Sequence, residues 1–537
     1  MLDTNEFHTY VIHRLIQFQT IKNILKNEIP KKIFSTHNLS LIISSFTHHS
    51  KISILNDIED KEKLAWDELN IILKIGPFSL PVKISRKKYH FLKNSFEKIV
   101  GNFFHLWFDP KKNSKIILFL EFNPSVYDEL ICSFKNHEIS PVFLNLRRSA
   151  VWNFASINAL RKNNAKIVNI QKLLDSKTKI SLNNFHREFI EKFDKFWKND
   201  ESLLKQFIFD EISLWPSIKD ILIKTYEKRL FEYLTMITMG TKFFETQNIQ
   251  CVVSLNEVGE TEKAILNLPN NLKPSVLLEH GFVTYIPEIS MFDPPSYYHL
   301  LRDKIAVWGE SQKNYLCKVK KIPEDKILTV GSPRHDNFFK KIDNTHNVKT
   351  KKTLLLTTHP IMDLIGRGGI LDHEKFEFFL RNLVNVKKTF SDLDLIVKLH
   401  PSPDPQHEYT KIFLKKLDPT IKIFQTTPIL DLINDSDAMI NVSEFYSPST
   451  AIMESMILNR PVVYVSLYEK EIPYDFIKKN AVLSIHADAD LSKSIYDILY
   501  NENKREEIIN NAQSFLNDYL SNPGTSSKNF SKVLSSL

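Results

Sequence analysis

Short apolar runs alternate with stretches of helical periodicity along most of the chain. Between residues 113 and 345 the runs fall at 116–122, 141–146, 166–170, 251–255, 275–278, 305–310 and 327–330. Continuous apolar runs of this length are typical of strands buried in a parallel sheet, because helices cover both faces of such a sheet. The alternation therefore predicts right-handed strand–helix–strand units that build a parallel α/β domain.

A polar and basic stretch at 340–352 interrupts this pattern, and we interpret it as an interdomain linker. A second parallel sheet is then predicted by apolar runs at 353–357, 395–397, 438–440 and 461–465. We expect an α/β fold of two Rossmann-like domains that face a cleft, because 537 residues exceed what one compact core usually holds. The first domain spans 113–345, with a helical insertion at 185–247, and the second spans 346–537 and ends in helices.

The first 112 residues follow a different pattern, which predicts an N-terminal α+β extension. Residues 39–46 are expected to form a strand, and residues 91–108 to form a helix whose apolar face includes Phe96, Ile99 and Phe103. Such a helix can pack on the next domain as part of a core, or it can lie on a membrane surface. We favour the core position, and no chemistry is assigned to the extension.

Composition and charge narrow the classes of function only slightly. Hydrophobic residues make up 42% of the chain and charged residues 25%, which is typical of a soluble globular protein. The formal net charge of +8 suits a polyanionic ligand or an anionic membrane surface. The basic residues form no concentrated stripe with interleaved aromatic residues, which disfavours nucleic-acid binding.

Cysteine content and the lengths of the apolar runs indicate the compartment. Cys132, Cys251 and Cys317 are widely spaced and odd in number, so they predict neither a disulfide framework nor a zinc site. No apolar run approaches the roughly 20 residues that span a bilayer, and the first residues are too polar for a secretory signal. We expect a cytoplasmic protein, and a peripheral contact with the inner face of the membrane stays open.

Polar clusters follow the predicted strands of the second domain, where open α/β sheets bind their ligands. Ser449 and Thr450 open a short helix over 451–458, and free N–H groups and the positive dipole end at such a position favour phosphate. Glu454 lies one turn further on and can accept hydrogen bonds from ribose hydroxyls. The alternative is that these residues only cap a helix or end a strand.

Further cationic and polar residues complete this candidate donor site. Arg334 follows the strand at 327–330 and offers a guanidinium fork for phosphate. The full set of candidate donor-binding residues is Arg334, His359, Lys398, His400, Ser443, Ser447, Ser449, Thr450 and Glu454. Together they predict a nucleotide-activated donor on the second domain.

The strand at 275–278 continues into Glu279-His280-Gly281-Phe282, which is the candidate reacting centre. A histidine at a strand end, followed by glycine, can face an open cleft and act as a general base, since its usual pKa is about 6.5. Glu279 and Glu260 are the other catalytic candidates, either as the base or as groups that orient the imidazole. The alternative for His280 is a structural histidine bonded to a backbone carbonyl.

Three Asp-x-Asp pairs raise the question of a metal, namely Asp392/Asp394, Asp435/Asp437 and Asp488/Asp490. The first two precede predicted strands and the third is placed as a helix cap, so none follows a strand as a metal-binding pair would. We expect no metal and no cofactor. The charge of a donor phosphate would instead be met by cationic side chains and a helix N-terminus.

The order of these motifs resembles that of GT-B transferases of surface polymers. The nearest likeness is to CDP-glycerol glycerophosphotransferases and capsular polysaccharide glycosyltransferases, and a looser one is to non-hydrolysing UDP-N-acetylglucosamine 2-epimerases. It covers roughly residues 250 to 465. The motifs that carry it are His280-Gly281, Trp308-Gly309-Glu310, Gly331-Ser332-Pro333-Arg334-His335-Asp336, Lys398-Leu399-His400-Pro401, Ser447-Pro448-Ser449-Thr450 and Arg460-Pro461-Val462.

The resemblance implies that the donor nucleotide lies on the second domain and that His280 is the base. It also implies that His400 and the cluster of Ser447, Ser449 and Thr450 contact donor phosphate. The expected function is transfer of a sugar or polyol phosphate from a nucleotide-sugar or CDP-polyol donor to a hydroxyl of a surface glycan or lipid-linked acceptor.

Two other functions stay open. A 2-epimerase would need carboxylates that move a proton at the sugar, and the acidic helix start typical of those enzymes is replaced here by Ser447-Pro448-Ser449-Thr450. A non-catalytic scaffold would keep the phosphate cluster and bind a nucleotide sugar without turning it over.

Overall fold

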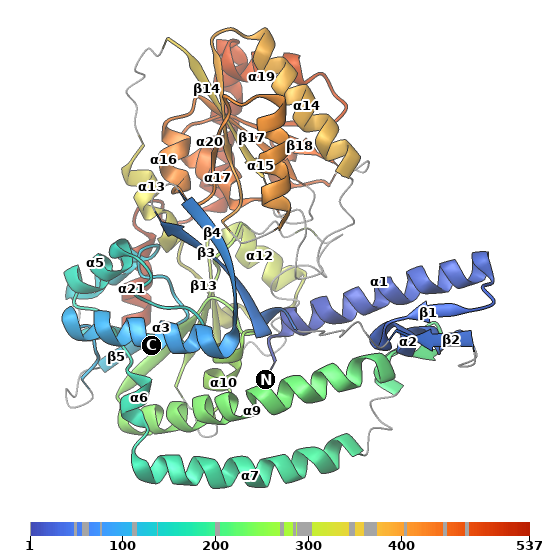
Figure 1. Cartoon of the computed structure of the whole chain (residues 1–537). Helices are drawn as coiled ribbons and strands as arrows, with labels where there is room; N and C mark the ends of the chain where they lie inside the picture. Colours follow the sequence, from blue (N-terminus) through green and yellow to red (C-terminus); the bar gives the residue numbers. More distant parts are fainter. Residues whose placement is uncertain are drawn as a thin grey trace.

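The computed structural model describes residues 2–47, 51–55, 64–75, 78–109, 115–136, 138–198, 205–268, 273–282, 286, 303–342, 350–358, 373–401, 405–443, 448–467 and 472–537. Two large parallel sheets, each with helices packed against it, form the body of the molecule (Figure 1). None of the helices within the described ranges combines the length and the apolar content that a membrane span requires.

The first sheet has the strand order β13-β12-β11-β10-β5-β6-β7, and all its pairings are parallel. Its strands are β5 (Lys115–Leu120), β6 (Ile139–Leu144), β7 (Lys166–Ile167), β10 (Ile249–Ser254), β11 (Ser275–Leu278), β12 (Lys304–Val307) and β13 (Ile327–Thr329). Chain order runs outward in both directions from β5 and β10, so the topological switch point of this sheet lies between them.

Helices pack against this first sheet, and two long ones extend beyond it. The shorter helices are α4 (Asp128–Ser133), α5 (Phe154–Lys162), α6 (Ile170–Leu173), α10 (Glu260–Leu266), α12 (Glu310–Lys318) and α13 (Asp336–Lys340). The long pair, α7 (Ser176–Lys198) and α9 (Trp215–Thr246), packs together, and α9 also packs on α10. A small hairpin, β8 (Ile208–Phe209) with β9 (Ile212–Ser213), lies between them in the chain.

The second sheet has the strand order β16-β15-β14-β17-β18-β19 and is also parallel throughout. Its strands are β14 (Lys352–Thr358), β15 (Leu393–Lys398), β16 (Lys422–Phe424), β17 (Ala438–Ser443), β18 (Val462–Ser466) and β19 (Leu483–His486). The helices around it are α14 (His373–Thr389), α15 (Pro405–Leu417), α16 (Ile429–Asn434), α17 (Thr450–Ile457), α18 (Asp475–Lys478), α19 (Leu491–Leu499) and α20 (Glu502–Tyr519). The switch point lies between β14 and β17.

This arrangement confirms the predicted fold class of two parallel, Rossmann-like α/β domains with an N-terminal extension. One detail differs from the range given to the second domain. The last helix, α21 (Ser526–Ser536), packs against α4 of the first domain, and its Phe530 and Leu534 join the core there (Figure 1). The end of the chain therefore belongs by its contacts to the first domain.

The N-terminal extension contains α1 (Thr4–Glu28), β1 (Ile33–Ser35), α2 (His37–Ile43), β2 (Ile52–Ile54), the hairpin of β3 (Glu68–Ile75) and β4 (Phe78–Ser85), and α3 (Arg86–Phe103). The predicted strand over 39–46 is wrong, because most of that stretch is helix α2. Its Ile42 is buried in the cluster that also holds residues of α9, so tertiary packing outweighs the β-propensity of the Leu-Ile-Ile run.

Helix α3 corrects a second expectation. Val100 is buried against the first domain, but Phe96, Ile99 and Phe103 are exposed. The helix packs on its polar side instead, where buried Arg86 and Lys93 make ion pairs. Part of the apolar face that we assigned to the core, namely Phe96, Ile99 and Phe103, therefore faces outward, whereas the rest, Val100, Phe104 and Trp107, packs against the first domain.

The two domains are joined by a close seam along residues 519–527. The backbone N–H of Ser521 donates to the carbonyl of Trp308 at 2.8 Å. A Cβ on Gly309 would collide with the carbonyl oxygen of Tyr519, and one on Gly331 with that of Ser521. Gly331 also has a positive φ of 87°, which favours glycine. These glycines are thus explained by close backbone approach rather than by ligand contact.

A buried ion-pair cluster fixes the extension to the first domain. Arg229 on α9 donates to Glu6 on α1 at 2.7 Å, to Asp67 at 2.8 Å and to Glu260 on α10 at 3.0 Å. Burial alone would lower the pKa of Arg229, but the hydrogen bond and charge of Glu6, with those of its other partners, raise it well above its usual value. The guanidinium is therefore charged and holds three separate parts of the chain together.

We predict that Arg229→Ala lowers the free energy of unfolding by about 3–5 kcal/mol, because it leaves buried carboxylates without their cation. Urea unfolding followed by circular dichroism measures this. Arg187→Ala is the matched control, because Arg187 is exposed and bonds only to Asn184 on its own helix among the contacts seen here; its effect should stay within about 0.5 kcal/mol. Equal effects of the two substitutions would contradict the structural role of the cluster.

Candidate functional site

The switch point of the second sheet presents unsatisfied polar atoms. Thr358 ends β14, and Asn441 lies opposite Thr357 in β17, where its Nδ2 donates to the Thr357 hydroxyl at 2.9 Å. The Thr358 hydroxyl and the Asn441 Oδ1 are buried and have no hydrogen-bond partner among the described residues. Because buried polar atoms are normally paired, these atoms mark a place where a ligand or water would be bound.

Helix α17 begins beside this point, and its first hydroxyls have defined partners. The Ser449 side chain caps the helix by accepting from the Ala451 N–H at 3.3 Å. The Thr450 hydroxyl accepts from the Phe282 N–H at 3.3 Å, which ties the helix to the loop after β11. Accepting that bond leaves the Thr450 O–H free in principle to donate to a phosphate oxygen.

Lys398 ends β15 and is largely buried. Its Nζ donates to the carbonyls of Gln425 at 2.7 Å and Leu399 at 2.9 Å, which fixes the ammonium at the edge of the sheet. Burial lowers the pKa of Lys398 to about 8, although the charge of Glu454 opposes the shift. The Lys398 ammonium is thus held in a fixed place, and a bound anion would favour its protonated form.

Glu454 on α17 contacts two side chains of the first domain. Its Oε1 lies 3.5 Å from Nη2 of Arg334 and 3.4 Å from Nε2 of His335. Burial alone would raise the pKa of Glu454, but the His335 ring 3.4 Å away and the charges of Arg334 and Lys398 hold it below its usual value. The carboxylate is therefore ionised and forms a polar contact between the domains.

Arg334 connects this carboxylate to the candidate reacting centre. Its Nη1 donates to the backbone carbonyl of His280 at 2.6 Å, while Nη2 faces Glu454. His280 itself is exposed, and among the described residues no atom lies within 4 Å of the position that a Cβ on Gly281 would take. The structure thus connects the loop of His280 to Glu454 through Arg334 and to Thr450 through Phe282, and Lys398 is close enough for its charge to act on Glu454.

Glu279 has a structural partner in this loop. Its carboxylate accepts from the Trp308 backbone N–H at 3.0 Å, and its carbonyl accepts from the Trp308 indole at 2.9 Å. Glu279 therefore links the ends of β11 and β12, and it positions the loop that carries His280.

Glu260 lies outside this group, and we correct its proposed catalytic role. The residue is 1% exposed, and its carboxylate binds Arg86 at 2.6 Å, Arg229 at 3.0 Å and the Tyr233 hydroxyl at 2.6 Å. Burial would raise its pKa, but the two guanidinium charges hold the pKa below its usual value. An ionised, fully engaged carboxylate of this kind anchors α1, α3 and α9 rather than moving a proton.

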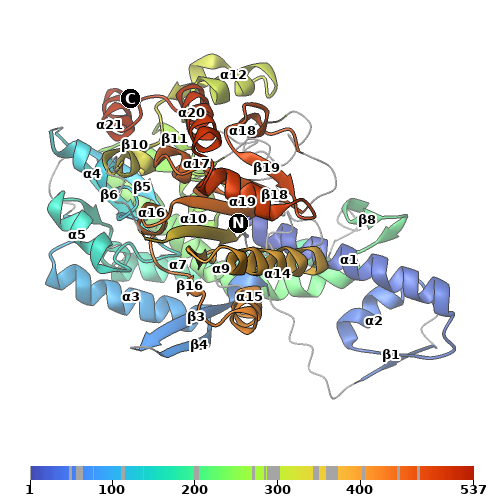
Figure 2. The ribbon, with the colours of Figure 1, turned by 90° about the horizontal axis from the view of Figure 1, so that it is seen from above.

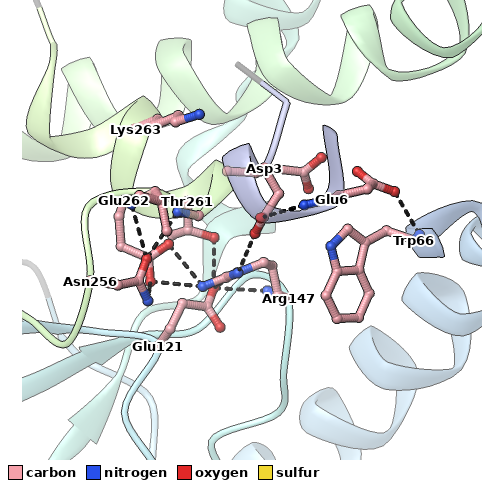
Figure 3. A network of polar contacts seen from close by, with 12 residues as sticks. Asp3, Glu6, Trp66, Glu121, Arg147, Asn256, Thr261, Glu262 and Lys263 are labelled. Atoms are coloured by element: carbon pink, nitrogen blue, oxygen red, sulfur yellow. Dashed lines mark hydrogen bonds and ion pairs between the residues drawn. The ribbon is translucent and has the colours of Figure 1, made fainter. Parts of the chain in front are cut away.

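In the first sheet, charged side chains of the protein itself lie at the switch point. Asp3, just before α1, contacts Arg147 at 3.3 Å, and Arg147 binds Glu262 at 2.7 Å (Figure 3). Glu121, which follows β5 with a positive φ of 57°, accepts from the Thr261 hydroxyl at 2.6 Å and from the N–H groups of the loop after β6. Side chains of the protein itself thus lie at this switch point, although the Arg147 Nε and Asn145 Oδ1 atoms there are buried without a hydrogen-bond partner among the described residues.

For four of the predicted donor-binding residues, the structure describes few contacts or none. His359 and Ser447 lie outside the described residues, and so does the side chain of Ser443, whose backbone ends β17. His400 follows β15 and is partly exposed, and its carbonyl lies 3.5 Å from Nε2 of Gln425. Their contact with a donor stays a prediction.

Sequence reasoning missed His335, although it lies in the motif that supplied Arg334. His335 is fully buried, and its Nδ1 lies 2.6 Å from the Ser332 hydroxyl. Burial lowers its pKa to about 4, so the ring is neutral at pH 7; the Ser332 hydroxyl then donates to Nδ1, and Nε2–H points toward Glu454. The sequence shows that His335 follows Arg334 directly, but it does not show that the imidazole is buried.

No protein-family model matches the sequence, and no curated protein matches it. Solved structures similar to the chain include the UDP-GlcNAc 2-epimerase from Neisseria meningitidis bound to UDP-GlcNAc. That structure is 14% identical, covers 79% of this chain and 100% of its own, and has a TM-score of 0.47.

Two further similar structures come from glycosyltransferases and polymerases of cell-surface polymers. A variant of S. aureus TarM in complex with UDP and glycan ligands is 13% identical over 79% of this chain and 100% of its own, with a TM-score of 0.46. The wall teichoic acid polymerase TagF is 10% identical over 84% of this chain and 97% of its own, with a TM-score of 0.41.

We predict that His335 makes stability depend on pH. Its folded pKa of about 4 lies below the unfolded value of 6.5, so its stabilising effect is present above pH 6.5 and is lost as pH falls toward 4. Between pH 7.5 and pH 5 the wild type should lose about 2 kcal/mol more unfolding free energy than His335→Gln, which cannot titrate. Urea unfolding at both pH values measures the difference, and parallel losses would contradict a buried neutral histidine.

Proposed function

We propose that the chain is a GT-B transferase that moves a sugar or polyol phosphate from a nucleotide-activated donor to a hydroxyl of a surface glycan or lipid-linked acceptor. One observation carries the proposal: an exposed histidine from the first domain is connected through Arg334 to a phosphate-favouring edge of the second. That edge combines Lys398, the start of α17, and the Thr358 hydroxyl and Asn441 Oδ1, which have no hydrogen-bond partner among the described residues.

The proposed donor site uses the second domain. The diphosphate of the donor would lie against the first N–H groups of α17 and receive a hydrogen bond from the Thr450 hydroxyl. Lys398 would supply positive charge from a fixed position, which costs no reorganisation when negative charge develops on the leaving group. Glu454 is held ionised and close to the donor edge, and it would keep Arg334 oriented.

The proposed chemistry takes place at the exposed His280. Its imidazole would take the proton of the acceptor hydroxyl while that oxygen forms a bond to the activated carbon, or to phosphorus for a polyol phosphate donor. The bond from that atom to the nucleotide phosphate breaks at the same step, and the phosphate carries away the electron pair. Among the described residues, none comes within 4 Å of the position of a Cβ on Gly281, which is consistent with an acceptor approaching there.

We predict selective binding of one nucleotide among UDP, CDP, CMP and GDP by calorimetry. Thr450→Ala should weaken it about tenfold, because the hydroxyl contributes a hydrogen bond to a charged phosphate. Thr235→Ala is the matched control: this hydroxyl bonds only within α9 at an exposed position among the contacts seen here, and its loss should leave binding unchanged. If wild type binds none of the four nucleotides, the donor site is wrong.

We also predict that nucleotide diphosphate affinity falls as pH rises above about 8, the pKa of Lys398 in the free protein. Bound phosphate would favour the ammonium form, so affinity should drop toward tenfold per pH unit once Lys398 loses its proton. Lys398→Gln should bind more weakly and lose this pH dependence. A wild-type affinity that is flat from pH 7 to 9.5 would remove Lys398 from the site.

The substitution His280→Ala separates the proposed transferase from the alternatives. We expect it to lower the transfer rate by about 10²–10⁴-fold and to leave nucleotide affinity unchanged, because a general base acts on the acceptor and not on the donor. The measurement is product formation with the selected nucleotide donor. Sugar whose configuration at C2 has changed is counted as the product of epimerisation. Turnover that survives in His280→Ala would refute the base assignment, and binding without any turnover by wild type would favour the scaffold.

A further inference from the structure

Helix α3 presents an apolar face to solvent that the proposed site does not use. The exposed fraction is 71% for Phe91, 69% for Ile99 and 75% for Phe103, and Leu92 and Phe96 are exposed beside them. Residues 92, 96, 99 and 103 follow helical spacing and therefore form one stripe. Exposed apolar stripes of this size are uncommon on soluble proteins unless something covers them.

A segment that contacts α3 also carries exposed aromatic residues. Ala150 donates its N–H to Glu97 of α3 at 3.3 Å, and two residues further on Trp152 is exposed, followed by Phe154, which is 85% exposed. Both views place α5, which begins at Phe154, alongside α3 at the edge of the molecule (Figures 1 and 2). Exposed aromatic residues are thus present on two neighbouring elements of the first domain.

The exposed charges on α3 itself have a single sign. Lys87, Lys88 and Lys98 of α3 are exposed. Glu97 is the one acidic residue in 86–103, and its carboxylate is turned inward to Lys93 at 3.1 Å. An apolar stripe flanked by exposed lysines is the pattern that binds an anionic membrane surface, because acyl chains take up the apolar groups and lipid phosphates attract the cations.

Helix α7 shows that this pattern is not a general property of the surface. It too has exposed aromatic residues, namely Phe185, Phe189 and Phe196. However, within 185–196, the segment that carries these aromatic residues, exposed Glu188, Glu191 and Asp194 balance the three exposed basic residues Arg187, Lys192 and Lys195, so the charges beside them give no net attraction for anionic lipid. The α7 face therefore offers a matched comparison.

The inner side of α3 relates this patch to the proposed site. Arg86 binds Glu260 just after β10, and Lys93 donates to the Asn145 carbonyl just after β6 at 3.0 Å. Helix α3 thus lies over the carboxyl ends of the first sheet, the same edge from which His280 extends after β11. A surface bound by α3 would lie near the edge at which an acceptor must arrive.

We propose that the face formed by Phe91, Leu92, Phe96, Ile99 and Phe103, with Lys87, Lys88 and Lys98, docks the protein on an anionic lipid bilayer. The docking rests on this face alone and needs no nucleotide. Its link to the proposed function is that a lipid-linked acceptor would be presented at the edge that carries His280.

The test is flotation of the full chain with vesicles of phosphatidylglycerol and phosphatidylcholine, compared with phosphatidylcholine alone. Wild type should float with the anionic vesicles. Phe91→Ser/Ile99→Ser/Phe103→Ser should lower the partition coefficient at least tenfold, and Lys87→Gln/Lys88→Gln/Lys98→Gln by about fivefold per lysine at low salt. Phe185→Ser/Phe189→Ser/Phe196→Ser on α7 should float like wild type.

Several outcomes would overturn the docking surface. Wild type that does not float, an α3 variant that floats like wild type, or equal losses in the α3 and α7 variants would each do so. A wild-type dimer that the α3 substitutions turn into a monomer, with no flotation, would assign the face to a second copy of the chain. Unchanged melting temperatures and nucleotide affinities of the variants show that the fold is intact, and they separate a failure of docking from a failure of the donor site.

Discussion

The close backbone approach between residues 519–527 and the strand ends of the first domain determines how the rest of the molecule is arranged. Gly309 and Gly331 permit the approach because neither has a Cβ. Asp336 then fixes it, since its carboxylate accepts the N–H groups of Ser526 and Ser527 at 3.1 and 2.7 Å at the start of α21. A bulkier residue at either glycine would push the two domains apart, and the contact of Glu454 with Arg334 would be lost with it.

This seam explains why residues of very different chemistry meet at the interdomain edge. The loop after β11 is held by Trp308 and by Thr450, so His280 is exposed at a fixed place. Arg334 then joins that loop to the ionised Glu454. The neutral His335 ring lies beside the same carboxylate and adds no charge. The single negative charge of Glu454 is outweighed by the positive charges of Arg334 and Lys398. The resulting net positive charge suits a phosphate ligand.

The two sheets use the same topology in different ways. The switch point of the first sheet is filled by Asp3, Arg147, Glu121 and Glu262, so the N-terminal segment supplies groups that a ligand would otherwise supply (Figure 3). The switch point of the second sheet keeps buried polar atoms unsatisfied within the described part of the chain. The two switch points therefore differ in the charged side chains that the protein itself places there. Glu260 was misassigned because its position after a strand was predictable but its arginine partners were not.

The sequence by itself determined the two parallel sheets and the strand ends that carry polar residues, because strands buried on both faces require continuous apolar runs. It did not determine α2 or the outward face of α3, since the same apolar spacing serves a core or a surface. Only the tertiary structure decided which polar groups meet: Phe282 and Thr450 bond across 168 residues, and Arg229 joins segments from α1 to α10. Such contacts depend on how elements pack in space, and local periodicity carries no information about that.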